Sequence, residues 1–176
     1  TATTAGNSYP SPSAIKNEHK RAGYADRFAE KAGVNAVMNM GDTEEELAAL
    51  LQAEDFESPY YKSLCEGGKV IALGMPVNFS SDEFAEGIVK GLTFLSENDA
   101  PFLVHCTEGK DRAGFASMLI EALMGASEEE IVRDYMLSYV NYYGVEEGSE
   151  KYDMIAEKNI MEMLRSLAGL EKGASL

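Results

Sequence analysis

The sequence predicts an α/β domain with a central, largely parallel sheet flanked by helices, and an all-helical C-terminal part. Two observations predict this fold class. Short apolar runs alternate with stretches that open in helix-capping patterns, as they do in strand–helix–strand units. In addition, a polar loop, "VHCTEGKDRAG" at Val104 to Gly114, follows one apolar run and precedes a strongly helical stretch.

The chain has 176 residues, enough for a substantial core, so we expect one domain over residues 1–176. Hydrophobic residues make up 45% and charged residues 26%, which predicts a globular chain rather than a disordered one. The formal charge of −15 disfavours nucleic acid and anionic membrane lipid as partners. No apolar run approaches the roughly 18 residues of a membrane span. The sequence shows no signal peptide, but it begins "TATTAG" without a methionine, so a cytoplasmic and a secreted location both stay open.

The first half of the chain shows a regular order of predicted elements. Residues 1–13 are rich in Ser, Thr, Pro and Gly and predict an irregular lead-in. Residues 17–31 predict a helix, and the apolar residues 34–40 predict a buried strand. A capping box opens a predicted helix over 43–53, and residues 55–68 predict a loop or a broken helical piece.

The same alternation continues through the middle of the chain. Residues 69–77 predict a second strand, and a capping box at Ser80 opens a predicted helix that runs to residue 98. Residues 101–105 predict a third strand of continuous apolar character. Residues 113–125 are apolar almost all round, which predicts a helix buried in the middle of the domain.

The C-terminal part, residues 127–170, is predicted to be helical. It contains a helix capped by Ser127 and a final helix over 150–167 with an apolar stripe at helical spacing. This order places the loop of residues 104–114 where the third strand passes into the buried helix. In open α/β sheets, that carboxyl end of a strand is where ligands bind.

The loop pairs a cysteine, Cys106, with an arginine, Arg112, five residues further along. Gly109 and Gly114 permit a tight backbone, whose N–H groups converge on an anion beside a helix N-terminus. The helix terminus and neighbouring cations favour the thiolate form of a cysteine there. The planar fork of Arg112 is suited to two oxygens of one phosphate. These residues therefore predict a cradle for a tetrahedral dianion with a nucleophile at its floor, as phosphoryl transfer through a phosphocysteine requires.

The stretch "HCTEGKDRAG" resembles the phosphate-binding loop of the cysteine-dependent protein tyrosine phosphatases, in the bacterial branch that reads His-Cys-x-x-Gly-Lys-Asp-Arg-Thr-Gly. The similarity extends loosely over residues 11–143. It implies the phosphotyrosine-phosphatase fold, with Cys106 as nucleophile, Arg112 as phosphate clamp and His105 supporting the thiolate. It also implies no metal and no organic cofactor. The remaining phosphate-binding positions that it implies are Thr107, Glu108, Gly109, Lys110, Ala113 and Gly114.

Two departures from the family pattern concern catalysis. Ala113 stands where the family has a Thr or Ser hydroxyl that hydrogen-bonds the thiolate. Loss of such a bond is worth about 1.5–3 kcal/mol, or a rate lower by about ten- to a hundredfold. The chain has no tryptophan, so it lacks the Trp-Pro-Asp loop that supplies the general acid in many members. Asp111 is the leading candidate for this acid, followed by Asp42 and then Asp82.

The resemblance implies a phosphatase that prefers a phosphotyrosine protein or peptide, with a small phosphomonoester as an alternative substrate. Lys110 is also compatible with a phosphoinositide, which the net charge disfavours. A catalytically weak phospho-binding module is the alternative function, because Ala113 and the missing acid loop fit a cradle that turns over poorly. Sulfur transfer or arsenate reduction is a third possibility, and reduction requires a resolving cysteine close by.

Two further groups of residues have open interpretations. Lys16, His19, Lys20 and Arg21 form the densest basic patch, which is either a solvated helix face or a contact for a second phosphate or an acidic peptide. Four tyrosines, Tyr60, Tyr61, Tyr142 and Tyr143, either line a slot that selects phosphotyrosine or pack near helix ends.

Overall fold

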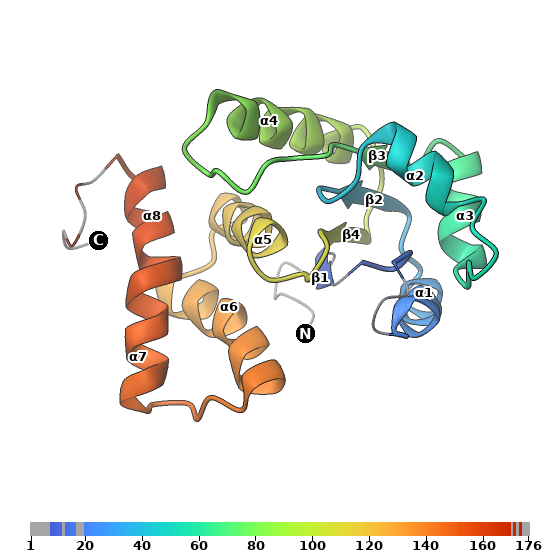
Figure 1. Ribbon diagram of the computed structural model, residues 1–176. Coiled ribbons are helices and arrows are strands. Elements are labelled where there is room, and N and C mark those ends of the chain that lie inside the picture. The colour runs from blue at the N-terminus through green and yellow to red at the C-terminus, as the bar shows by residue number, and fades with distance from the viewer. Residues whose placement is uncertain (1–7, 12, 17–19, 170, 172, 174–176) are drawn as a thin grey trace. The chain divides into compact units, whose positions relative to one another are not determined.

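The computed structural model describes residues 8–11, 13–16, 20–169, 171 and 173 (Figure 1). The chain divides into two compact units, Ala2–Ser117 and Met118–Leu176. Helix α5 (Arg112–Leu123) begins in the first unit and ends in the second. The two units are described separately below.

The first unit contains a sheet of parallel strands in the order β1-β4-β2-β3. Val37 lies opposite Leu103 on one side and opposite Val70 on the other. All four residues of β2 are buried, as the continuous apolar run predicted. The parallel sheet therefore confirms the predicted α/β class. The strands are β1 (Ser8–Ser11), β2 (Ala36–Asn39), β3 (Val70–Ala72) and β4 (Phe102–His105).

Helices surround this sheet in Figure 1. They are α1 (Ala22–Lys31), α2 (Glu44–Leu50), α3 (Pro59–Glu66), α4 (Asp82–Ser96) and the first part of α5. Side chains alternate between the two faces of a strand, so neighbours in β2 pack in different cores. Val37 belongs to a buried cluster with Ala29 of α1 and Leu64 of α3. Met38 packs instead against α4, where a Cβ on Gly91 would come within 2.1 Å of the Met38 Cε.

Three aromatic rings join α4 to the start of α5 within the first unit. Phe84 of α4 meets Phe115 of α5 edge to face, with ring centroids 5.1 Å apart. Phe79, from the segment before α4, lies 5.0 Å from Phe84 and 5.6 Å from Phe115. Such aromatic pairs are stabilising beyond the area that they bury. The start of α5, which follows the polar loop, is therefore anchored in the core.

The predicted capping boxes are confirmed at one of two positions in the first unit. The Thr43 hydroxyl accepts from the Glu46 N–H, and the Glu46 carboxylate accepts from the Thr43 N–H at 2.8 Å. The box predicted at Ser80 is wrong. Helix α4 begins at Asp82, and its N-cap is Ser81, whose hydroxyl accepts from the N–H of Phe84. A turn before the helix explains the shift, because the N–H groups of Ser80 and Ser81 both donate to Asn78.

The helix predicted over 17–31 begins later than expected. Helix α1 starts at Ala22, because Lys20 has a positive φ of 54°, a left-handed conformation that cannot continue a right-handed helix. Residues 17–19, including His19 of the basic patch, lie outside the described residues.

The irregular lead-in predicted for residues 1–13 is also corrected in part. Strand β1 pairs in parallel with β4, and Ser8 lies opposite Phe102. This strand lies at the edge of the sheet. A proline has no N–H to donate to a neighbouring strand, so Pro10 is tolerated at an edge and would not be tolerated in a central strand. Strand β1 forms because β4 offers an edge for pairing. The composition of residues 8–11 does not predict this strand.

The second unit is helical. Its elements are the end of α5, α6 (Glu128–Tyr143), α7 (Glu150–Ala156), the π-helical turn η1 (Glu157–Met161) and α8 (Glu162–Leu167). The predicted cap of α6 is confirmed, since Ser127 and Glu130 form a capping box. The single helix predicted over 150–167 is interrupted by the π-helical turn. The predicted burial of residues 113–125 fails at its end, where Leu123 and Met124 are exposed.

Among the residues that the structure describes, none of the helices has both the length and the apolar character that a membrane crossing requires.

Candidate active site

Cys106 directly follows β4, and Arg112 is the first residue of α5. Strand β4 lies between β1 and β2, so the loop from Cys106 to Arg112 leaves the carboxyl end of an inner strand. The structure confirms the predicted position of this loop at the ligand-binding end of the sheet.

The backbone of the loop turns toward the cysteine sulfur. Gly109 has a φ of 78°, which favours glycine because a Cβ is strained in this region. Its N–H donates to the Sγ of Cys106 at 3.3 Å. The Cys106 side chain is buried, so this contact acts on a sulfur that is largely removed from water. A backbone N–H that points at the end of such a side chain is one of the donors from which anion-binding loops are built.

The guanidinium of Arg112 is fixed by two distant backbone segments. Its Nη1 donates to the carbonyl oxygen of Met75 at 2.8 Å and to that of Met40 at 3.1 Å. Its Nη2 donates to the Thr107 hydroxyl at 3.2 Å, within the loop itself. These three contacts fix the orientation of the planar guanidinium at the loop.

His105 is fully buried beneath the loop. Its Nε2 lies 2.8 Å from the Tyr61 hydroxyl, and its Nδ1 lies 3.4 Å from the Cys106 carbonyl oxygen. Burial lowers the pKa of His105 to about 4, and burial raises the pKa of Tyr61 well above its usual value. Near neutral pH the imidazole is therefore uncharged, with Nδ1–H donating to Cys106 and Nε2 accepting from Tyr61. His105 orients the backbone of Cys106 without adding a positive charge, and Tyr61 packs in the core rather than lining a substrate slot.

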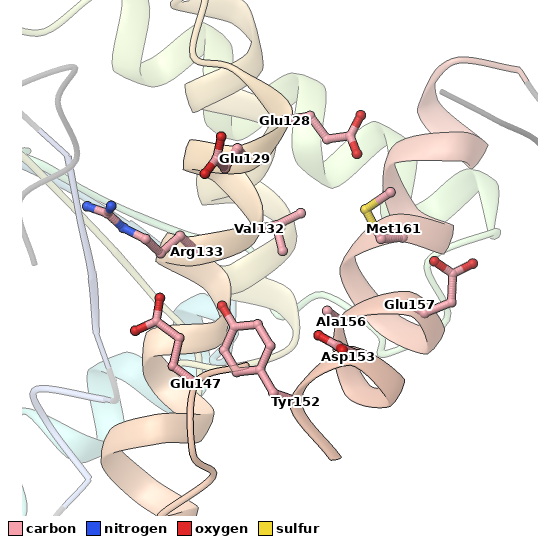
Figure 2. Close-up of a pocket in the computed structure, with 10 residues that line it drawn as sticks. All are labelled: Glu128, Glu129, Val132, Arg133, Glu147, Tyr152, Asp153, Ala156, Glu157 and Met161. Carbon is pink, nitrogen blue, oxygen red and sulfur yellow. The ribbon is translucent and has the colours of Figure 1, made fainter. Parts of the chain in front are cut away.

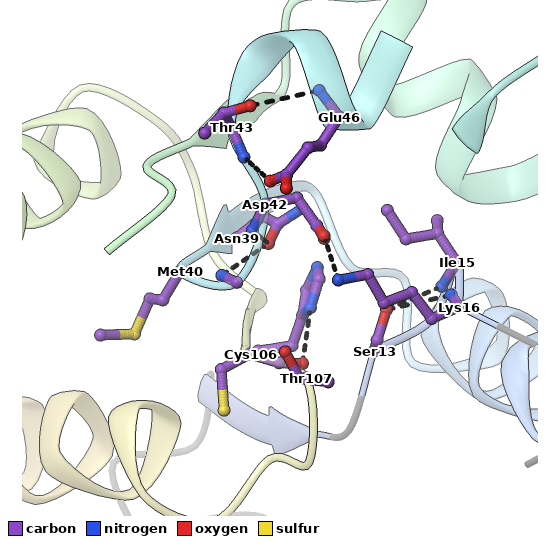
Figure 3. A network of polar contacts seen from close by, with 12 residues as sticks. Ser13, Ile15, Lys16, Asn39, Met40, Asp42, Thr43, Glu46, Cys106 and Thr107 are labelled. Atoms are coloured by element: carbon purple, nitrogen blue, oxygen red, sulfur yellow. Dashed lines mark hydrogen bonds and ion pairs between the residues drawn. The ribbon is translucent and has the colours of Figure 1, made fainter. Parts of the chain in front are cut away.

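Asp42, an alternative general acid, lies near the loop but is occupied by other contacts (Figure 3). Its carboxylate is 1% exposed. One oxygen accepts from the Asn39 side-chain amide at 3.0 Å, and the other lies 2.6 Å from the Lys16 ammonium. Lys16 of the predicted basic patch therefore contacts a carboxylate of the protein.

The other two candidate acids are more exposed. The Asp111 side chain is 43% exposed within the loop, where Lys110 lies 3.8 Å from its carboxylate and 3.4 Å from that of Glu108. Asp82 is exposed at the start of α4. Ala113, in contrast, is fully buried in the first turn of α5. Of the three carboxylates, Asp111 is the one that the chain itself places inside the loop.

Several groups that shape the site were not predicted from the sequence. The backbone carbonyls of Met40 and Met75 hold Arg112, and Asn39 holds Asp42. Every residue carries a carbonyl, so no sequence signal distinguishes these two acceptors. A glycine followed by an aspartate, as at Gly41 and Asp42 after the predicted strand, is typical of a turn, and this signal could have indicated the Asn39 region.

A separate pocket of about 590 Å³ lies within the helical unit (Figure 2). Its charged lining consists of five carboxylates and the guanidinium of Arg133. An excess of negative charge repels a phosphate dianion, so this pocket does not suit a phosphorylated substrate. Within the described part of the chain, no three His, Cys, Asp or Glu side chains are grouped as a metal ion would require.

The sequence profile of the tyrosine phosphatase family matches residues 19–173. A provisionally named tyrosine-protein phosphatase of Cupriavidus necator is 38% identical over 48 residues. These residues are 27% of this chain and 18% of that protein, so the chain spans less than a fifth of the relative's length. Among solved structures, the core catalytic domain of the PP-IP phosphatase SIW14 from S. cerevisiae, in complex with citrate, is similar with a TM-score of 0.42 and 15% identity. That match covers 90% of this chain and 93% of the other.

The family match covers almost the whole chain and includes the cysteine loop, the sheet from β2 onward and the helices of both units. It confirms the resemblance that the loop showed. The chain belongs to the tyrosine phosphatase family, a family of phosphatases.

Proposed function

We propose that this protein hydrolyses phosphomonoesters, with phosphotyrosine preferred, through a covalent phosphocysteine on Cys106. The observation that supports this proposal is a single loop in which the Gly109 N–H donates to the Cys106 sulfur and two backbone carbonyls hold the Arg112 guanidinium in place. A nucleophile and its phosphate clamp are thereby oriented before substrate binds, which is the preorganisation that phosphoryl transfer requires.

In the first step, the Cys106 thiolate attacks phosphorus and forms an S–P bond while the bond to the leaving oxygen breaks. The loop N–H groups and Arg112 stabilise the three equatorial oxygens throughout. The leaving oxygen takes a proton from Asp111, so a neutral alcohol or phenol departs. In the second step, water attacks the phosphocysteine and the Asp111 carboxylate takes its proton. Inorganic phosphate leaves, and the thiolate is regenerated.

The contacts of the three candidate acids favour Asp111 for this role. A general acid must reach the leaving oxygen and exchange protons with water after each turnover. Asp111 is half exposed inside the loop, whereas the Asp42 carboxylate is buried between Lys16 and Asn39. Asp82 lies at the N-terminus of α4, where a carboxylate also stabilises the helix dipole.

Family membership supports phosphotyrosine as the preferred group, as does the name of the relative from Cupriavidus necator. Lys110 beside the loop adds a positive charge that also suits phosphoinositides or small phosphomonoesters. A phospho-binding module with little turnover is the alternative that Ala113 allows. Turnover and binding must therefore be measured separately.

The test is hydrolysis of a phosphotyrosine peptide by the wild type, Cys106→Ser and Asp111→Asn. Cys65→Ser is the matched cysteine control, and Asp55→Asn, at an exposed aspartate, is the matched carboxylate control. We expect Cys106→Ser to bind the peptide without turnover and both controls to retain wild-type rates. We expect Asp111→Asn to lose the basic limb of the pH–rate profile. If the wild type binds the peptide and releases no phosphate at any pH, the chain is a binding module instead.

A further inference from the structure

The turn after β2, Asn39 to Asp42, is closed by a buried amide side chain. The Asn39 Oδ1 accepts from the N–H of Gly41 at 2.9 Å and from that of Asp42 at 3.1 Å. Its Nδ2 donates to the Asp42 carboxylate at 3.0 Å. A buried amide is costly unless it is hydrogen-bonded, and these three bonds satisfy most of its capacity. Asn39 thereby determines the path of the turn.

The Asp42 carboxylate also contacts a residue outside this turn, Lys16. Its Oδ1 lies 2.6 Å from the Nζ of Lys16, whose side chain is 26% exposed. A carboxylate as buried as this one requires a partner charge. Lys16 lies in the segment that follows β1, and the N–H of Ser13 in that segment donates to the Thr107 carbonyl of the cysteine loop. The ion pair therefore joins two backbone segments that both contact the loop.

The backbone of the turn contacts the cysteine loop directly. The Met40 N–H donates to the His105 carbonyl at 2.8 Å, and the Met40 carbonyl accepts from Arg112. Gly41 lies so close to the loop that a Cβ there would meet the Thr107 nitrogen at 3.1 Å and the Cys106 carbonyl carbon at 3.2 Å. A shift of the turn would therefore move both the phosphate clamp and the nucleophile.

The second acceptor for Arg112 depends on the same turn. The Met75 carbonyl accepts from Arg112, and the Met75 N–H donates to the Met40 carbonyl at 3.0 Å. The neighbouring Gly74 N–H donates to the Asp42 carbonyl at 2.8 Å. Both carbonyls that hold the guanidinium are thus tied to the turn that Asn39 and Asp42 close.

We propose that Asn39, Asp42 and Lys16 are positioning residues. They fix the turn that holds Arg112 and the cysteine loop at the spacing that a phosphoryl group requires, and Asp42 transfers no proton. This inference rests on the proposed function of the same loop. A displacement of about 1 Å in a reacting group costs roughly a hundredfold in rate, so a shift of this turn lowers turnover even where the protein stays folded.

The test compares Asp42→Asn, Lys16→Met and the double variant with Asp55→Asn and Lys62→Met, which change exposed residues of the same types. Initial rates are measured with p-nitrophenyl phosphate, whose leaving group needs no proton, and with phenyl phosphate, whose leaving group does. Tungstate binding is measured by calorimetry. We expect each single variant to lose about ten- to a hundredfold in kcat, by the same factor on both substrates, and to bind tungstate more weakly.

The double variant is expected to be no slower than the slower single variant, because both substitutions remove one ion pair. It also removes both charges, so it can be tested if a single variant with an unpaired buried charge fails to fold. A loss confined to phenyl phosphate would make Asp42 the general acid and overturn the proposal. Rates and tungstate affinity equal to those of the two controls would overturn it as well.

Tungstate binding separates this inference from the proposed function. If the wild type binds tungstate but hydrolyses neither substrate, the proposed function fails. Weaker tungstate binding by Asp42→Asn would then still support the positioning role, and unchanged binding would overturn it.

Discussion

The hydroxyl of Tyr61 lies 2.8 Å from Nε2 of His105, and both side chains are buried directly beneath the cysteine loop. The rings meet edge to face, with centroids 5.5 Å apart. Since burial keeps the imidazole uncharged, this bond determines which nitrogen carries the proton, and with it the contact of Nδ1 to the Cys106 carbonyl. A hydrogen-bond chain without a charged member, from Tyr61 through His105 to the Cys106 carbonyl, therefore supports the cysteine loop.

Tyr61→Phe removes this hydroxyl and leaves Nε2 of His105 buried without its partner. We expect the free energy of unfolding to fall by about 1–3 kcal/mol, the cost of an unsatisfied buried polar group. Urea unfolding at neutral pH measures the change. Tyr24→Phe removes the hydroxyl of an exposed tyrosine and should leave stability unchanged. Equal stabilities for the two variants would show that the Tyr61 bond contributes nothing net.

The lowered pKa of His105 predicts that the folded protein loses stability in acid. Burial lowers its pKa to about 4 in the folded protein, whereas the pKa of a histidine in an unfolded chain is near 6.5. The unfolded chain therefore binds more protons between these values, and stability falls as pH drops from 6.5 toward 4. We expect the free energy of unfolding of wild type relative to that of His105→Gln to fall as pH drops from 6.5 toward 4, as urea unfolding at a series of pH values would show. His19→Gln removes the other histidine, and the same change relative to that variant would contradict the assignment.

The raised pKa of Glu121, in the helical unit, predicts the opposite dependence of stability on pH. Burial, together with the nearby carboxylates of Asp134 and Glu130, raises its pKa to about 8. Among the described residues, its Oε1 has no hydrogen-bond partner. The folded protein therefore retains a proton that the unfolded chain releases, so stability falls as pH rises from about 4.5 to 8.

Glu121→Gln keeps the shape of this side chain and removes its titration. We expect the variant to gain stability relative to wild type at pH 8 and to gain little at pH 4.5, as thermal unfolding at the two pH values would show. Glu171→Gln is the control at an exposed glutamate. An equal gain at both pH values would mean that packing, and not the charge of Glu121, limits stability.

The elements with local signals were predictable from the sequence. Strands β2 and β4 lie in short, mostly apolar runs, and the boxes at Thr43 and Ser127 bring together residues three apart. Strand β1 was missed because its partner is β4, far along the chain, and its own residues favour a turn. The start of α1 was missed because the left-handed conformation of Lys20 has no composition signal.

The same distinction applies to the candidate site. Cys106, Gly109 and Arg112 lie in one contiguous loop, so their spacing predicted a phosphate cradle. The groups that hold this cradle come from separate segments. Lys16 contacts Asp42 through a side chain, and the acceptors of Arg112 are backbone atoms. Only tertiary structure brings these groups together, so the sequence alone leaves Asp42 as a candidate acid.

Ala113 gives the last prediction, because the family loop carries a hydroxyl at this position. Ala113 is fully buried in the first turn of α5, next to Arg112 in sequence. A hydroxyl that donates to the Cys106 thiolate stabilises it as a leaving group when the phosphocysteine breaks down. A charge-assisted bond of about 1.5–3 kcal/mol corresponds to a rate change of about ten- to a hundredfold. We therefore expect Ala113→Ser to raise kcat when hydrolysis of the intermediate limits turnover.

The measurement is the burst and the steady-state rate of p-nitrophenol release from p-nitrophenyl phosphate. If breakdown of the intermediate limits the wild type, it shows a burst, and Ala113→Ser raises the steady-state rate relative to that burst. Ala116→Ser adds a hydroxyl to another buried position of the same helix, and controls for the packing cost. A faster Ala113→Ser beside an unchanged Ala116→Ser would mean that the family hydroxyl acts on the thiolate. If Ala113→Ser is no faster than wild type, the attack by Cys106 on phosphorus limits turnover. That step gains nothing when the thiolate becomes a better leaving group.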